Sequence, residues 1–579
     1  MDKKAVLHIP MSEYAYAVDE GRVVIRLRCA CGDLISCTLH YGDRACRQNP
    51  VVFTAVPMQV VASDWQFDYF EAEFDTPYTR LCYYFELSDG VETILYYADL
   101  FSADTVPERS EYYQLPYIHR ADIATAPDWA ADAVIYNIFP DSFATGRRYI
   151  SKRPTEASYM GIPTHGKLGG TIRGITENAN YLVELGINCI YINPIFAAGE
   201  YHKYDLLDYY SIDPCFGSNQ DFAEMVNTLH QHDIKVIIDG VFNHCGWRFF
   251  AFEDVVANGG HSRYRDWFYR VQHPIVRPGN MEDIPEYECF AYERLMPKLN
   301  TANPDVAAYF CDVCRYWLRE YRIDGWRLDV ASEVDDGFWR TFRRAALDEN
   351  PDALLIGEVW ESAGHWLDGS MFNSSMNYDF RKHCREYFAR GAINAQEFAS
   401  RITNMLMRYR KNLLPAQLNL LDSHDVSRFL SLCGGDIGRF KLAVLFQMCF
   451  VGMPSIFYGD EQGITGLLEE EYRCPMSWNG GDLFDFYQRA IRLRKEQPAL
   501  RRGIYSSIMA GHDRLFVFCR EDRDSRITVA MNAGDDTVAY TRPEGDDVIW
   551  RSGGSKSTID PQGFVISITP LEKGGAPCL

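Results

Sequence analysis

Val236-Ile237-Ile238-Asp239 is a short apolar run that ends in a carboxylate, and it is one of eight such runs between residues 131 and 498. Stretches with the amphipathic spacing of surface helices separate the runs. Strands that are apolar along their whole length are typical of parallel sheets covered on both faces. Eight alternations of strand and helix predict a closed (β/α)8 barrel, an α/β fold. The eight predicted strands lie at 134–139, 189–194, 236–239, 326–329, 354–358, 375–378, 418–422 and 455–458.

The spacing of these runs is uneven at one point. The third run ends near Asn243 and the fourth begins near residue 325, a gap too long for one helix, so we expect an inserted subdomain at about 245–300. Outside the barrel, short β-branched and aromatic runs alternate with Gly and Asp turns. The sequence therefore predicts an N-terminal β-sandwich at 1–122, the barrel at 123–498 and a C-terminal β-sandwich at 499–579.

Composition narrows the classes of partner. The chain has 579 residues with 58 basic and 80 acidic side chains, which gives a net charge of −22. Nucleic-acid binding needs clustered Lys and Arg, so the acidic balance argues against a nucleic-acid partner and also against docking on anionic lipid. We expect no targeting segment and no membrane span. The longest apolar stretch, 442–457, is interrupted by Gln447, Gly452 and Pro454 and predicts a buried helix followed by a buried strand.

The 17 cysteines are odd in number and scattered, which is not the pattern of a disulfide framework. The one CxxC pair, Cys311 and Cys314, lies in a helix-like stretch and lacks the second pair that a structural zinc site needs. We therefore expect free thiols in a reducing cytoplasm, no metal site and no cofactor.

Three carboxylates follow the ends of predicted barrel strands. Asp329 ends the fourth run, Glu358 ends the fifth, and Asp425 follows the seventh. Because barrel enzymes carry their reacting groups at the carboxyl ends of the strands, these side chains are expected at one mouth. Each carboxylate alone could equally be a helix cap or half of an ion pair. Three at one mouth suit glycoside hydrolysis, which needs an anionic nucleophile and an acid for the leaving oxygen.

The neighbours of two carboxylates suggest different roles. Arg327 lies two residues before Asp329, so on a strand both side chains face the same way. The guanidinium is expected to lower the pKa of Asp329 and keep it ionised, as a nucleophile requires. Glu358 lies between Gly357 and Val359, an apolar setting that is expected to raise its pKa and hold the proton of a general acid.

Other polar residues near these strand ends could contact a sugar. His244 follows the third run, and His424 directly precedes Asp425. Neutral imidazoles suit hydrogen bonds to hydroxyl groups, whereas the absence of an HExxH pattern argues against a metal role. Tyr204 could stack on a sugar ring or could simply be a packed tyrosine.

Six motifs resemble those of the alpha-amylase family of glycoside hydrolases, in the family's order. They are Gly-Ile-Asn (186–188) with Pro-Ile-Phe (194–196), Asp-Gly-Val-Phe-Asn-His (239–244), Met-Pro-Lys-Leu-Asn (296–300), Gly-Trp-Arg-Leu-Asp (325–329), Gly-Glu-Val-Trp (357–360) and Ser-His-Asp (423–425). The motif at 296–300, with Val-Ala-Ser-Glu at 330–333, resembles the neopullulanase, cyclomaltodextrinase and maltogenic amylase subfamily.

The resemblance implies a role for each matching position. Asp329 matches the nucleophile, Glu358 the general acid/base and Asp425 the third carboxylate, which orients the distorted sugar. The positions that match substrate-binding groups are Tyr204, Asp239, His244, Arg327, Glu333, Trp360, His424 and Arg428; among them Asp239 matches a buried, more structural acid, and Glu333, Trp360 and Arg428 match outlying subsites.

The resemblance also implies an activity. Such enzymes are retaining hydrolases that cleave α-1,4 bonds in cyclodextrins, maltooligosaccharides and pullulan, with α-1,6 cleavage left open, and retention allows transglycosylation. The N-terminal sandwich of the subfamily is carbohydrate-binding-like and often joins a homodimer. We therefore expect a cytoplasmic homodimer whose partner molecule is an oligosaccharide, an α-glucan. A transglycosylase, an enzyme for an unusual oligosaccharide such as a pseudo-oligosaccharide inhibitor, and a non-catalytic carbohydrate-binding relative remain the alternatives.

The chain departs from the subfamily in a loop that often binds calcium. Here residues 143–149 read Phe-Ala-Thr-Gly-Arg-Arg-Tyr, and Thr171 stands where a later calcium-binding Asp is expected. Calcium needs several oxygen ligands, usually with carboxylates among them, and two arginines oppose it. We therefore predict no calcium at this loop. Glu361 and Cys245 also differ from residues common in the subfamily, which leaves the substrate preference open.

Overall fold

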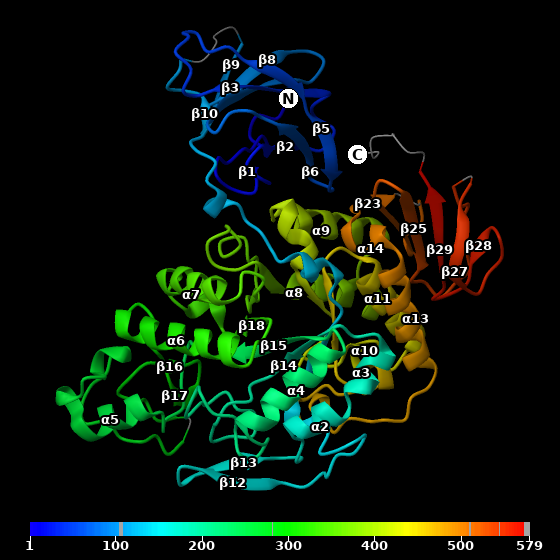
Figure 1. Cartoon of the computed structure of the whole chain (residues 1–579). Coiled ribbons are helices and arrows are strands. Elements are labelled where there is room, and N and C mark those ends of the chain that lie inside the picture. Colours follow the sequence, from blue (N-terminus) through cyan, green and yellow to red (C-terminus); the bar gives the residue numbers. More distant parts are fainter. Residues whose placement is uncertain (104–107, 281, 509–510, 544, 572–579) are drawn as a thin grey trace.

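Ten strands in the first 115 residues form two antiparallel sheets above the rest of the molecule in the computed structural model (Figure 1). The structure describes residues 1–103, 108–280, 282–508, 511–543 and 545–571. The first sheet has the order β1 (Ala15–Ala17), β2 (Arg22–Ala30), β6 (Phe67–Asp75), β5 (Gln59–Ser63). The second has the order β4 (Thr54–Pro57), β3 (Ser36–Asp43), β7 (Leu81–Ser88), β8 (Thr93–Tyr97), β9 (Leu100–Ser102), and β10 (Tyr113–Leu115) also pairs with β7.

Strand β2 is buried on both faces, which ties this sandwich to the central domain. Val23, Ile25 and Leu27 point into the core between the two sheets. On the other face the Arg26 guanidinium is ion-paired with Glu71 at 2.8 Å and donates to the carbonyl of Met407. The sandwich therefore rests on the barrel through a satisfied buried charge.

Eight parallel strands close into a barrel at the centre of the molecule, because β11 pairs with both β14 and β22. The predicted (β/α)8 fold is confirmed. Every residue of the barrel strands is buried except Lys235 at the start of β15. The strands are β11 (Ile135–Ile138), β14 (Cys189–Ile192), β15 (Lys235–Gly240), β18 (Gly325–Leu328), β19 (Leu354–Gly357), β20 (Ser374–Asn377), β21 (Leu418–Leu420) and β22 (Met453–Phe457).

Helices surround the barrel, and polar residues cap several of them. Ser218 and Asp221 form a reciprocal capping box at the start of α4, and Asp335 caps α7. The helices are α1 (Pro140–Phe143), α2 (Ile172–Glu177), α3 (Ala179–Leu185), α4 (Asn219–Gln231), α6 (Pro304–Glu320), α7 (Asp336–Glu349), α8 (Tyr378–Cys384), α9 (Ala395–Met407), α10 (Phe429–Leu432), α11 (Ile437–Cys449), α12 (Glu469–Tyr472), α13 (Asp482–Glu496) and α14 (Pro498–Arg502).

Two excursions leave the barrel on the side of its mouth. The inserted segment between β15 and α6 contains α5 (Phe250–Asn258) and the short pair β16 (Cys289–Phe290) and β17 (Glu293–Pro297). A hairpin that the sequence did not predict, β12 (Thr155–Tyr159) and β13 (Ile162–Gly166), follows α1. Both excursions lie on the lower side of the barrel in Figure 1, away from the two β-domains.

The C-terminal region is a second strand-rich domain. Its main sheet has the order β23 (Ile504–Ile508), β24 (Leu515–Glu521), β25 (Ser525–Asn532), β29 (Phe564–Pro570), β27 (Asp547–Ser552), and β26 (Val538–Ala539) pairs with β28 (Thr558–Ile559). The predicted C-terminal segment extends to 579, and its last eight residues lie outside the described residues.

The apolar stretch at 442–457 forms the end of α11 and strand β22, as predicted, and both are buried. Two buried arginines close the end of α11: Arg494 donates to the carbonyls of Met448 and Phe450, and Arg520 to that of Cys449. Cations at a helix C-terminus offset its partial negative charge. In the part of the chain that the structure describes, no helix combines the length and apolar character needed to cross a membrane.

Candidate active site

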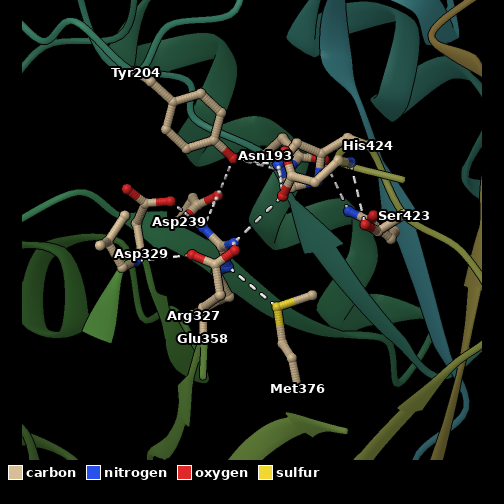
Figure 2. A network of polar contacts seen from close by, with 12 residues as sticks. Asn193, Tyr204, Asp239, Arg327, Asp329, Glu358, Met376, Ser423 and His424 are labelled. Carbon is tan, nitrogen blue, oxygen red and sulfur yellow. Dashed lines mark hydrogen bonds and ion pairs between the residues drawn. The ribbon is translucent and has the colours of Figure 1, made fainter. Parts of the chain in front are cut away.

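Arg327 on β18 is fully buried beneath the mouth of the barrel and contacts several carboxylates. Its Nη1 is 2.9 Å from Asp239 Oδ1 and 2.7 Å from Asp329 Oδ1, and its Nη2 is 2.8 Å from Glu358 Oε1. Asp425 Oδ2 is 3.8 Å from the same Nη2. Figure 2 shows Asp239, Asp329 and Glu358 converging on this guanidinium. The three predicted catalytic carboxylates therefore meet around one arginine.

The register of the barrel strands produces this convergence. Arg327 is paired directly with Asp239 of β15, and Leu328 with Gly357 of β19, which precedes Glu358. Val330 then turns the chain with a left-handed φ of 45°, an unfavourable conformation for a β-branched residue. This turn aims the Val330 N–H at Glu358 Oε2, 2.8 Å away. Backbone strain of this kind is often stored at functional sites.

The pKa of Asp329 is raised, not lowered. Burial disfavours its charge and the neighbouring Glu358 carboxylate repels it, and together these effects exceed the lowering by Arg327. The prediction of a lowered pKa for Asp329 is therefore wrong, because a sequence pattern reveals neither the depth of burial nor a second acid nearby. Arg327 is shared among several carboxylates and neutralises no single one of them.

The predicted apolar setting of Glu358 is also wrong. Its Oε1 lies against Arg327 and accepts from Trp360 Nε1 at 3.2 Å, while its Oε2 accepts the Val330 N–H. Its apolar neighbours in sequence do not create an apolar setting, because Gly357 has no side chain and Val359 packs into the main hydrophobic core. The Glu358 carboxylate is thus held by two hydrogen bonds and one ion pair.

Asp425 is the most accessible of the three carboxylates, with a quarter of its side chain exposed. Its Oδ2 is 3.1 Å from His424 Nε2, and its Oδ1 is 3.6 Å from Arg473 Nη2. Burial and the charge of Glu358 raise its pKa to about 7. Asp425 therefore changes protonation close to neutral pH.

Aromatic and amide groups link Asp239 to His424, the neighbour of Asp425. Tyr204 donates its hydroxyl to Asp239 Oδ2 at 3.0 Å and also contacts His424 Nε2. Tyr191 donates to the same Asp239 oxygen at 2.7 Å, and Asn193 Nδ2 is 2.9 Å from His424 Nδ1. Figure 2 shows Tyr204 and Asn193 turned toward His424.

Sequence reasoning missed three members of this network. Asn193 and Tyr191 lie at the carboxyl end of the second predicted strand, so their position there was a usable signal. Arg473 follows the short helix α12, a loop position that no strand pattern identifies.

His244 is buried at the edge of the mouth and stacks on Phe290 of the inserted segment, with ring centroids 4.6 Å apart. Burial lowers the pKa of His244 to about 3, so the imidazole is neutral near pH 7. Its Nε2 has no hydrogen-bond partner among the described residues. Burial also lowers the pKa of His424. Both histidines are therefore neutral donors or acceptors, as expected.

Two predicted residues lie at the rim and one lies away from the site. Trp360 is half-exposed and stacks flat on Tyr378, with centroids 4.1 Å apart. The Glu333 carboxylate is half-exposed, 3.4 Å from Lys298 Nζ. Arg428 is instead fully buried, paired with Asp460 at 2.9 Å and stacked on Phe457. The structure does not bring Arg428 to a substrate surface.

In the loop at 143–149, the Thr145 N–H donates to the carbonyl of Tyr149 and the Thr145 hydroxyl to that of Gly169, both at 2.7 Å, and the segments beside the loop are also hydrogen-bonded. The Asp141 carboxylate accepts the backbone N–H groups of Lys167, Leu168 and Gly169 at 2.9 to 3.1 Å. Thr171 caps α2 by accepting the Gly174 N–H at 2.9 Å. The described residues contain no group of three or more His, Cys, Asp or Glu side chains arranged to bind a metal.

A (β/α)8 barrel with three carboxylates around one buried arginine at its mouth defines a class of carbohydrate-cleaving enzymes. Comparison with known proteins specifies the family. The catalytic domain of alpha amylase matches residues 137–481, and the alpha amylase N-terminal Ig-like domain matches residues 1–119. The chain therefore belongs to the alpha-amylase family and is a glycoside hydrolase.

Its relatives carry the names that the motifs suggested. Neopullulanase 2 of Thermoactinomyces vulgaris is 40% identical over 97% of this chain and 99% of its own length. Intracellular maltogenic amylase of Bacillus subtilis is 39% identical over 86% of this chain and 85% of its own. A solved cyclomaltodextrinase matches with a TM-score of 0.89 at 35% identity, covering 98% of this chain and 100% of that one. The resemblance to this subfamily is confirmed.

Proposed function

We propose that this chain is a retaining α-glucan hydrolase that cleaves α-1,4 bonds in cyclodextrins, maltooligosaccharides and pullulan. The observation that carries the proposal is the shared arginine: Arg327 holds Asp329 and Glu358 at 2.7 and 2.8 Å while Asp425 lies open to the mouth. The names of the relatives support α-glucans as the substrate class.

Because the pKa of Asp329 is raised, the reacting molecules are those in which Asp329 is ionised and Glu358 carries the proton. In the first step, the Asp329 carboxylate attacks the anomeric carbon while Glu358 gives its proton to the leaving oxygen. The glycosidic bond breaks, and a covalent glycosyl ester forms on Asp329. In the second step, Glu358 accepts a proton from water, which attacks the same carbon and releases Asp329. Arg327 contacts both carboxylates, so it is well placed to stabilise the charge that returns to Asp329.

The remaining groups of the mouth suit a sugar ring. His244 Nε2 is buried and without a partner among the described residues, so a substrate hydroxyl would satisfy it. Asp425 and His424 lie side by side and offer a second pair of polar contacts. The flat stack of Trp360 on Tyr378 offers an aromatic surface at the rim for a sugar beyond the cleaved bond.

Four further properties belong to this proposal. Retention allows a second sugar to replace water, so we infer some transglycosylation at high substrate concentration. The chain functions in the cytoplasm, in keeping with its many cysteines and its intracellular relative. It forms a homodimer, which a concentration-independent monomer mass in solution would refute. The loop at 143–149 binds no calcium, which full calcium occupancy there would contradict.

Initial rates on β-cyclodextrin, pullulan, soluble starch and maltotriose test the proposed substrate class, with Glu358→Gln as the blank. We expect β-cyclodextrin and maltotriose to outrun starch, as in a narrow pocket. Starch as the fastest substrate would contradict the narrow pocket. The absence of activity on all four substrates would contradict the proposed function itself.

A further inference from the structure

Lys203 lies one residue before Tyr204 and is completely buried. Its Nζ is 3.0 Å from Asp213 Oδ2, and both side chains are fully inaccessible to solvent. The same Nζ donates to the carbonyl of His165 on β13 at 2.8 Å. Burying a lysine and an aspartate costs free energy that only close pairing and further hydrogen bonds offset. No role for this pair follows from the chemistry described above.

The backbone at Lys203 is unusual as well. Its φ of 64° places it in the left-handed region, which a residue with a side chain adopts only when its surroundings enforce it. This conformation sends the Lys203 side chain toward Asp213, while the next side chain, Tyr204, points to Asp239 and His424. The turn therefore separates a buried anchor from a residue at the reaction centre.

Asp213 is itself anchored at three points. Its Oδ2 accepts the Ala198 N–H at 3.0 Å, its Oδ1 accepts the Cys215 N–H at 2.8 Å, and its own N–H donates to the carbonyl of Ile195. It therefore marks a fixed point below the loop at 199–207, and Lys203 ties the middle of that loop to it.

We propose that Lys203 and Asp213 form a buried positioning pair that holds Tyr204 against Asp239 and His424 at the cleavage subsite. Through the carbonyl of His165, the pair also joins the hairpin β12–β13 to this loop. Hairpin and loop together line a groove of about 620 Å³ that the inserted segment closes on the other side. Lys203 is thus a positioning residue, which acts on the substrate only through Tyr204.

A double-mutant cycle tests the pair, and it rests on the proposed function for its activity readout. Lys203→Met is expected to lower kcat for maltotriose about 10- to 100-fold with a smaller change in KM, because displacing a group in the site by 1 Å can cost this much. In a Tyr204→Ala background the same substitution is expected to cost less than threefold. An equal loss of kcat in both backgrounds would overturn the proposal.

A control uses another Lys–Asp pair of the barrel, in which the lysine is 41% exposed rather than completely buried. Lys235 begins β15 and lies 2.9 Å from Asp324 at the opposite end of the strands. Lys235→Met is expected to leave kcat and KM within twofold of the original values. If Lys235→Met lowers kcat as much as Lys203→Met does, the effect is a general loss of packing, and the proposal fails.

Removing a single buried charge could also unfold the chain, so a second variant removes both. Lys203→Met with Asp213→Asn leaves no uncompensated charge and is expected to fold. Its kcat should still be lower than that of the original chain, and an unchanged kcat in this folded variant would overturn the proposal. Its crystal structure gives a readout independent of activity. We expect the Tyr204 hydroxyl to have left Asp239, whereas an unmoved Tyr204 would contradict the pair's role even if the chain cleaves no α-glucan.

Discussion

Two buried arginines at the mouth end of the barrel, Arg327 and Arg428, show how differently one chain uses the same side chain. Both are completely inaccessible to solvent. Arg327 lies within 3 Å of carboxylate oxygens on Asp239, Asp329 and Glu358. Arg428 has one ion pair, with Asp460, and packs between aromatic rings. Arg327 lies among acids of which one, Asp425, is partly open to solvent, whereas Arg428 and the acids near it, Asp460 and Asp422, are all buried.

The two clusters differ in whether solvent and substrate can reach their acids. Around Arg327, one positive charge faces several acids, so burial and mutual repulsion raise the pKa values of Asp329 and Asp425. A site of this kind can accept and release protons. Around Arg428, burial and the neighbouring Asp422 also raise the pKa of Asp460, but Arg428 Nε donates to the carbonyl of Tyr472 and the whole cluster is shut off from solvent. We therefore regard the first cluster as chemical and the second as structural.

The largest expected effect follows from changing Asp329, the proposed nucleophile of the Arg327 cluster. Asp329→Asn keeps the shape of the side chain but removes the attacking oxygen anion, so kcat for maltotriose should fall about 10⁴-fold or more. Steady-state rates measure this loss, and Asp460→Asn is the matched substitution in the Arg428 cluster. An Asp329→Asn variant with more than about 1% of the original kcat would contradict the assignment.

The next effect is on stability and concerns the sealed cluster. Arg428→Met leaves Asp460 buried without its counter-charge and should lower the free energy of unfolding by about 3–5 kcal/mol. Urea denaturation measures this change. The folded fraction should bind maltotriose with a KM within about threefold of the original. A tenfold or larger rise in KM without loss of stability would restore the substrate-binding role that the sequence suggested for Arg428.

A smaller effect concerns the pH dependence of stability at Asp425. Folding raises its pKa to about 7 from a usual value of 3.8, so the unfolded chain loses this proton first as the pH rises. The stabilising contribution is therefore complete below about pH 4 and is lost by about pH 7. Between pH 4 and pH 7 the free energy of unfolding of Asp425→Asn should rise by about 1–3 kcal/mol relative to that of the original chain. The effect is kept to this size because the partial exposure of Asp425 weakens the pKa shift. Urea denaturation of both chains at pH 4, 5.5 and 7.5 checks this. The prediction fails if the difference between their free energies of unfolding is the same at all three pH values.

The smallest effect is expected at the rim. Glu333 is half-exposed and lies 3.4 Å from Lys298 Nζ, a pair that water screens. Glu333→Gln should change kcat/KM by no more than about fivefold, equivalent to at most about 1 kcal/mol. Maltotriose kinetics at low and high salt measure it. A loss of more than 30-fold would place Glu333 among the groups that contact the reacting sugar.

Strand-end patterns predicted the barrel and the convergence of Asp329, Glu358 and Asp425, because both depend on the alternation of strand and helix along the chain. They failed where long-range packing decides the outcome. The setting of Glu358 depends on Arg327, a residue on another strand, and the pKa of Asp329 depends on burial. Arg428 occupies a motif position, yet its side chain turns inward to Asp460, and the hairpin β12–β13 follows no periodic pattern.

We propose that Asp329 is the nucleophile and that Arg327 and Glu358 support it. Trapping with 5-fluoro-α-D-glucosyl fluoride, followed by digestion and peptide mass spectrometry, locates the residue that gains the sugar's mass. We expect a glycosyl ester on Asp329, and none on the same peptide of the Asp329→Asn variant. A label on Glu358 or Asp425, or a product released with inverted configuration and no label, would contradict it.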